Sequence, residues 1–456
     1  MKTKYILLLV SLVLLLSSCG IYTNYKRPGN IPLDGLYRDS VQRGDTSSVA
    51  TLSWRQLFTD TDLISLIELG LDHNSDLQKA LLQTEEADAT LQQSRAAFLP
   101  SISLTPEGQL SSFDGSKTAK TYSFGASASW EIDAFGSLRN NKEQKKATFE
   151  QTQAYAQAVR TKLIATIADS YYSLLMLDRQ LEITNTTITV WRQNLKAEIA
   201  MKEAGQANEA EVNQAEANCL SAEHSALTLT QQINEQENAL STLIGCVPQA
   251  IKRGTFANIS FPTTISAGVP LSMIEKRPDV RQSENSLKSA FYGVNKARSA
   301  FFPSITLSGT AGWTNSNGTA IVNPGKILLT TLGSLTQPIL DKGLNEANLK
   351  IAKAQQQEAM ISYNQSILNA GEDVNNALKQ WQTALYKQKL DEQEIDKLTT
   401  AVRNTKLLME NSTTNYLDVL NAEQTLLNAK LTAVSDKYSE IEGIILLYHA
   451  LGGGIN

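Results

Sequence analysis

The most constraining feature of the sequence is a long unit that occurs twice. Residues 95–104 read RAAFLPSISL and residues 298–307 read RSAFFPSITL, at an offset of 203 residues. After the next segment the offset becomes 207, and at that offset Gly136 aligns with Gly343. An alignment that continues from residues 95–104 to Gly136 indicates an internal duplication, so the fold must accommodate two copies of one unit.

The first copy contains two long stretches without helix breakers. Ser137 to Ala204 has no Gly or Pro, and the same holds for 206–244. A 68-residue helix would be ~100 Å long. The second copy repeats this plan from Leu344, although Gly371 and Gly443 fall inside its two helical stretches. The sequence therefore predicts two hairpins of unusually long helices.

Apolar and small residues form a seam along the second helix of each copy. The first seam contains one polar member and runs through Val212, Ala215, Cys219, Ala222, Ala226, Leu229, Ile233, Gln236, Leu240 and Leu243. The second runs through Leu427, Leu431, Val434, Tyr438, Ile441, Ile445 and Tyr448. Spacings of three and four predict coiled-coil packing, and Cys219 is interpreted as a small core residue rather than a redox group.

Between the repeated Pro-Ser-Ile segment and each long helix, apolar residues recur at every second position, which is the period of a β-strand. Apolar and small or polar residues alternate over 122–132, and Ser101 to Thr105 and Ile305 to Trp313 alternate as well. Ile327 to Ile339 is assigned as a strand from its place in the repeat. An apolar face against lipid and a polar face against a lumen would explain the pattern, although half-buried soluble strands look similar. Four strands cannot close a barrel, so several chains must contribute.

The first residues have the composition of an export signal. Lys2 and Lys4 precede an apolar run over 5–16, and the sequence then reads Leu-Ser-Ser-Cys-Gly with the cysteine at Cys19. We expect residues 1–18 to be a signal peptide. The ending resembles a bacterial lipobox, in which Cys19 would receive acyl chains such as palmitate; the alternative is an ordinary signal peptide that contains a cysteine.

Charge and composition argue against several classes of function. The formal net charge of −5 does not favour nucleic acid as a partner. The scattered His73, His224 and His449 have no second ligand at metal spacing, and no nucleophile motif or phosphate loop is present. We therefore expect no catalytic site, no metal site and no cofactor.

Taken together, these residues resemble the TolC-type outer-membrane efflux protein family, most closely its lipoprotein OprM/NodT-like branch. The resemblance covers nearly the whole chain. It rests on the lipobox at Cys19, Tyr25-Lys26-Arg27-Pro28, Trp54 with Phe58 and Leu63, Asn74-Ser75-Asp76-Leu77, Arg277-Pro278-Asp279-Val280-Arg281 with Glu284, Phe302-Pro303-Ser304-Ile305, Asn415-Tyr416-Leu417-Asp418-Val419-Leu420, and Ala450-Leu451-Gly452-Gly453-Gly454.

The resemblance implies a mainly α fold with a membrane β part. It implies a long coiled-coil α-helical barrel and a transmembrane β-barrel that is twelve-stranded in a homotrimer. The expected segments are a signal peptide (1–18), an N-terminal anchor and equatorial segment (19–71), repeat 1 (72–246, with a β-hairpin at about 101–135), an equatorial linker (247–273) and repeat 2 (274–453, with a β-hairpin at about 304–339).

The resemblance also indicates where partners and a gate would lie. The helical turns at Gly205 and Ser412 would meet a periplasmic adaptor protein. The family often carries an acidic residue just before the Asn-Tyr-Leu motif, where this chain has Thr414. Glu410 and Asp418 flank that place, and we interpret the three residues as a possible periplasmic gate. The alternative is that both carboxylates are solvated residues beside a turn, with Asp418 near a helix N-terminus.

The function favoured by this interpretation is an outer-membrane channel subunit of a tripartite efflux pump. It would be lipid-anchored in the cell outer membrane, extend into the periplasm, and serve an inner-membrane pump as a passive exit duct for small toxic compounds. The alternatives are the outer-membrane duct of a type I protein secretion system and a periplasmic coiled-coil adaptor. An envelope enzyme would need a convergent polar site, which the sequence does not contain.

Overall fold

The structure of the protein is a computed structural model. It describes residues 22–29, 36, 53–112, 114–115, 118–259, 261, 276–314, 328–411 and 416–453. The chain divides into two compact units. The first comprises Met1–Ile31, Leu82–Ala154 and Arg281–Gln365, and the second comprises Pro32–Leu81, Tyr155–Val280 and Ser366–Asn456.

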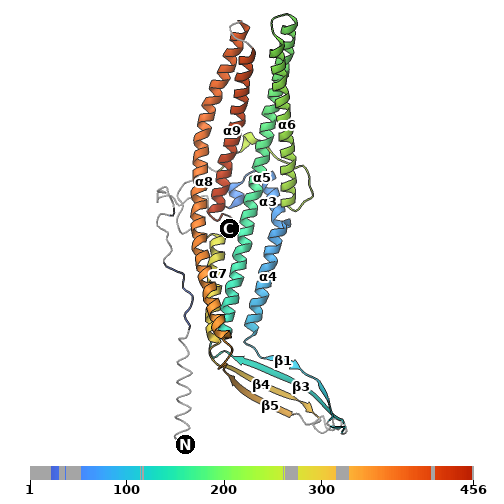
Figure 1. The fold of residues 1–456 in the computed structure, drawn as a ribbon, viewed down its shortest axis with the longest axis vertical. Helices are drawn as coiled ribbons and strands as arrows, with labels where there is room; N and C mark the ends of the chain where they lie inside the picture. The colour runs from blue at the N-terminus through green and yellow to red at the C-terminus, as the bar shows by residue number, and fades with distance from the viewer. Residues whose placement is uncertain are drawn as a thin grey trace. The chain divides into compact units, whose positions relative to one another are not determined.

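The first unit contains an antiparallel sheet (Figure 1). Its strands are β1 (Ser101–Leu104), β2 (Glu107–Ser111), β3 (Ala119–Ile132), β4 (Ser304–Thr314) and β5 (Leu328–Thr336). The order is β1-β3-β4-β5, and β2 also pairs with β3. Because β3 belongs to the first repeat and β4 to the second, the β3–β4 pair joins the two hairpins into one sheet.

The first strand is longer than expected and is interrupted. We expected it at Ser101 to Thr105, but β1 and β2 follow each other along the same edge of β3. The gap falls at Pro106, whose nitrogen carries no hydrogen to donate to the neighbouring strand. Thr105 still donates its backbone N–H to Gly125 O at 3.0 Å, so the two pieces act as one broken strand.

The two faces of the sheet differ in chemistry, as the alternation predicts. On one face Phe124 lies opposite Trp313, with the two rings stacked at 6.2 Å, and Trp130 lies opposite Leu307. On the other face the Ser103 and Ser127 hydroxyls are hydrogen bonded at 2.7 Å. The sheet therefore carries an aromatic and aliphatic face and a face of small hydroxyl side chains.

Helices make up most of the described chain. They are α2 (Trp54–Leu57), α3 (Thr61–His73), α4 (Ser75–Ala96), α5 (Ser137–Glu203), α6 (Glu209–Leu243), α7 (Pro278–Ser299), α8 (Leu344–Glu410) and α9 (Tyr416–Ala450), with a 3-10 turn at Phe256–Asn258. The helices α5 and α8 each have 67 residues, and α6 and α9 each have 35. The corresponding helices of the two repeats thus have equal lengths, as an internal duplication predicts.

None of the helices in the described ranges is both long and apolar enough to cross a membrane.

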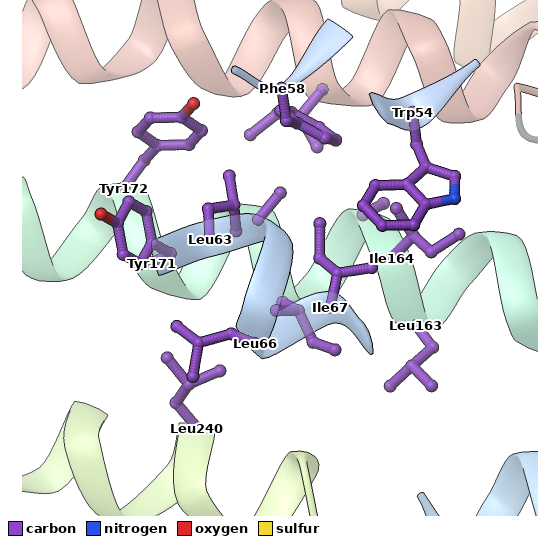
Figure 2. Close-up of a cluster of buried hydrophobic side chains, with 14 of the residues drawn as sticks. Trp54, Phe58, Leu63, Leu66, Ile67, Leu163, Ile164, Tyr171, Tyr172 and Leu240 are labelled. Atoms are coloured by element: carbon purple, nitrogen blue, oxygen red, sulfur yellow. The ribbon is translucent and has the colours of Figure 1, made fainter. Parts of the chain in front are cut away.

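The main core of the second unit anchors the short N-terminal helices to the long ones (Figure 2). Trp54, Phe58 and Ile67 of this region are almost completely buried against α5, α6 and α9. Asp60 caps α3 by accepting the N–H of Asp62 at 2.9 Å, and its other oxygen accepts the Tyr171 hydroxyl of α5 at 2.7 Å. The segment before the first repeat is thus packed into the base of the helical hairpins.

The predicted seams pack as coiled-coil contacts. Cys219 and Ala222 of α6 lie in one cluster with Trp191 of α5 and Leu427 of α9. Cys219 is 4% exposed, and burial raises the pKa of its thiol. It is a small core residue, as the spacing predicts.

Two glycines that seemed to interrupt the second repeat lie at close contacts instead. The helix α9 continues through Gly443, where an added Cβ would lie 2.9 Å from the backbone nitrogen of Trp381 in α8. The helix α8 continues through Gly371, where a Cβ would lie 2.5 Å from the side chain of Leu36. Each glycine is needed because a neighbouring segment comes close to the helix backbone.

Candidate functional site: the helical tip

The tip of the first helical hairpin is a tight turn at Gly205. Gly205 has φ +73°, a left-handed conformation in which glycine is unstrained. Its N–H bonds to Lys202 O at 2.9 Å, and Gln206 N bonds to Met201 O at 2.8 Å, which completes the C-terminal end of α5. Asn208 and Glu211 then form a reciprocal capping box that starts α6. The sequence alone therefore specifies this turn.

The tip of the second hairpin lies between α8 and α9. Glu410 ends α8, and Asp418 lies in the first turn of α9, where the helix dipole favours a negative charge. Both predicted carboxylates thus belong to the helix ends on either side of residues 412–415. Ser412, Thr414 and the side chain of Glu410 lie outside the described residues, as does Cys19.

A small apolar cluster joins the two hairpins below their turns. Ala215 of α6 packs with Tyr416, Val419 and Leu420 of α9, and Met409 of α8 packs against the same cluster. Leu195 of α5 packs against the cluster as well, so all four long helices meet near their ends.

A buried charge lies beside this cluster. The carboxylate of Glu423 in α9 is 7% exposed and forms an ion pair with Lys406 of α8 at 2.6 Å. Asn194 of α5 donates to the same carboxylate at 3.2 Å. Sequence reasoning missed this group, although Glu423 continues the α9 seam four residues before Leu427 and was recognisable as a polar seam position.

A second buried carboxylate, that of Glu198 in α5, has no compensating cation among the described residues. Glu198 is 2% exposed, and no described residue forms a hydrogen bond or ion pair with it. Burial, followed by the negative charge of Glu211 in α6, raises the pKa of Glu198. Burial also raises the pKa of the Tyr416 hydroxyl, with Glu423 and Glu198 adding to the shift. The arrangement favours proton uptake at Glu198, because only the ionised form carries an unpaired buried charge.

Within the described part of the chain, no group of three or more His, Cys, Asp or Glu side chains is placed to hold a metal ion.

Comparison with known proteins assigns the fold to a family. Residues 66–246 and 269–453 match the family model described as outer membrane efflux protein. The chain belongs to this family. The matched ranges cover the long helices and both hairpins of the sheet, and the family is one of outer-membrane channels.

Similar proteins span the whole length of the chain. The cation efflux system protein CusC of Escherichia coli O6:H1 is 28% identical over 449 residues, which are 97% of each protein. The probable outer membrane lipoprotein SilC of Salmonella typhimurium is 28% identical over 463 residues, 99% of each. The open-state structure of the Neisseria gonorrhoeae MtrE outer membrane channel superposes with a TM-score of 0.86 at 26% identity, over 96% of this chain and 99% of that one.

These similarities establish the class of function. The protein is an outer-membrane channel subunit of a tripartite efflux pump, and its place is the cell outer membrane. The expectation of a mainly helical channel with a β part is confirmed.

Proposed function

We propose that three copies of the chain close into one duct, with twelve strands in the outer membrane and the long helices forming a barrel in the periplasm. The observation that carries this proposal is the open sheet. In the described chain, β5 pairs only with β4, and the broken strand β1/β2 pairs only with β3. Unpaired strand edges are not tolerated in lipid, so these two edges must meet strands of other copies.

The duct is proposed to be passive and to carry small toxic compounds, cations among them. The face that lines it by register is rich in hydroxyl groups, such as those of Ser103, Ser127 and Ser308, which interact weakly with many solutes. Selection would therefore come from an inner-membrane pump. A periplasmic adaptor would connect the pump to the turns at Gly205 and Ser412. No catalytic role is proposed for any residue.

Two further roles remain proposals. Glu410, Thr414 and Asp418, repeated around the trimer, would form the constriction that keeps the tip closed. Cys19 would carry the acyl chains of the anchor. We also propose that the repeats extend over 72–246 and 274–453, because the equal lengths of α5 and α8 support a common origin.

Deleting the gene and measuring growth inhibition by a panel of metal ions, dyes, detergents and antibiotics tests the efflux role. We expect increased sensitivity to several small compounds, restored by the plasmid-borne gene. Unchanged sensitivity to every compound, together with loss of a secreted protein from the medium, would assign the duct to type I secretion instead.

A further inference from the structure

A cavity of about 530 Å³ lies on one side of helix α9, within the second unit. Its walls come from α5 and α9, with one residue of α8 and the aromatic side chain of Phe256 from the linker between the repeats. A cavity of this volume can hold a small organic molecule.

The cavity begins where the main core of the second unit ends. Phe256 packs against that core and also lines the cavity. On α9 the cavity is lined by Val434 and Lys437, and the same helix face continues to Ile441 and Ile444, which belong to the core. The face of α9 that the N-terminal segment covers in the core is therefore left uncovered by the described chain at the cavity.

The floor of the cavity is apolar. Ile183 of α5, Val434 of α9 and Ile395 of α8 line it together with Phe256. Val434 is 8% exposed, and the other three side chains are half-buried. Moving apolar surface from water onto such a floor is favourable, so the site suits a ligand with an apolar body.

The rim of the cavity is positively charged. It carries three cations, Arg179, Lys430 and Lys437, and one carboxylate, Glu182. Because the whole chain has a formal net charge of −5, this excess of cations is local.

The three cations differ in how far they are neutralised. Arg179 pairs with Glu182 at 2.6 Å, but both side chains are exposed, so the pair is weak. Lys437 pairs with Glu440 at 2.5 Å. Lys430 forms no hydrogen bond or ion pair with any described residue. Its ammonium group is therefore the one most available to an anion.

The hydroxyl groups in the wall add no donor for a ligand. Thr186 donates its hydroxyl hydrogen to Glu182 O at 2.9 Å, and Thr187 donates to Ile183 O at 3.0 Å. An acidic group in the cavity would therefore be bound through the cations, since charge-assisted N–H···O bonds are the strong ones.

We propose that this cavity binds a small amphipathic anion, an organic carboxylate or sulfonate with an apolar body. The apolar body packs on Ile183, Phe256 and Val434, and the acid group pairs with Lys430. Such a ligand contacts α5, α8 and α9 together, so its binding favours the present spacing of these helices. The site lies within one chain, and the inference goes beyond the proposed duct because it requires neither assembly nor transport.

Fluorine NMR of a trifluoromethyl-substituted benzoate tests the site. The full-length protein is placed in lipid nanodiscs, and empty nanodiscs of the same lipid correct for partition into the bilayer. We expect saturable broadening of the benzoate signal by the protein. The corresponding benzylammonium, which has the same apolar body and the opposite charge, should show none.

Four variants locate the binding. Lys430→Ala should weaken binding about tenfold, because it removes a charge-assisted bond, and Lys430→Arg should retain most of it. Ala433→Trp should also weaken binding, since it fills the cavity that Ala433 lines. The matched control is Lys397→Ala, which removes an exposed lysine of α8 outside the cavity and should leave binding unchanged.

The outcomes decide between the cavity and other sites. Benzoate binding that is lost in both K430A and A433W, and kept in K430R and K397A, supports the proposal. Binding that survives K430A and A433W would place the ligand elsewhere and overturn it. Equal binding of the benzylammonium, or no saturable binding to the wild type, would also overturn it and leave the cavity as a contact surface for a protein.

Discussion

Replacing Glu198 by glutamine should change the local stability of the tip in a pH-dependent way. The carboxylate is buried in α5, no described residue pairs with it, and burial together with Glu211 raises its pKa. A raised pKa in the folded state means that this state binds the proton more tightly than the unfolded state. Stability therefore falls as the pH rises from the ordinary pKa of a glutamate through the raised value.

The size of the effect follows from the same linkage. Each unit by which the pKa is raised corresponds to about 1.4 kcal/mol, or tenfold in the opening equilibrium of the tip. E198Q has no charge to bury, so its tip should open less often than the wild-type tip at pH 8. At pH 4, where Glu198 is mostly protonated in both the closed and the open tip, the two proteins should open to nearly the same extent.

Hydrogen exchange of amides at the end of α5 and the start of α6 measures this opening. Dividing the exchange rate of each amide in the wild type by its exchange rate in E198Q at the same pH cancels the intrinsic pH dependence of exchange. We expect a ratio near one at pH 4 that rises toward pH 8. The exposed Glu203 at the end of α5 supplies a matched control, since E203Q should leave the ratio flat. A ratio for E198Q that does not vary with pH would show that Glu198 does not bind a proton more tightly in the folded tip.

Three further predictions concern the anchor, the gate and the helix contact. Cys19→Ala should leave an unacylated precursor or an altered cleavage product. If mass spectrometry of the wild-type protein found that Cys19 is unmodified, the lipid anchor would be disproved. Changing Glu410 and Asp418 together to alanine should raise single-channel conductance in a planar bilayer and lower any cation preference; an unchanged channel would make them ordinary surface residues. Gly443→Ala should destabilise the α8–α9 contact by about 1–3 kcal/mol, because the new Cβ meets the Trp381 backbone. Urea unfolding would measure that change, and an unaltered midpoint would count against the close contact.

The long helices could be predicted closely from the sequence. The absence of Gly and Pro predicted a helix from Ser137 to Ala204, and α5 ends one residue earlier at Glu203. Local chemistry decides such ends, since Gly205 and the Asn208 capping box act over a few residues. Strand β4 was likewise placed within a residue at each end, because its alternation is local, and β5 was placed within a few residues from its position in the repeat.

Features that depend on contacts between distant segments were not predicted. The buried state of Glu198 and Glu423 requires α5, α6 and α9 to meet at one height, which composition and periodicity do not specify. The strand pairing beyond Pro106 was also not predicted. The expected strand ended at Thr105, and nothing in the local sequence indicated that β2 would continue to pair with β3 after the proline. Trp54 and Phe58 were recognised as family cues, but their place in the main core came only from the structure.

Several copies of this chain are proposed to make one duct together across the outer membrane. Native mass spectrometry of the full-length protein, extracted in a mild detergent and without cross-linker, tests it most directly. We expect a single species with three times the mass of the mature chain, stable at neutral pH. A monodisperse monomer that retains the full helical content would contradict it.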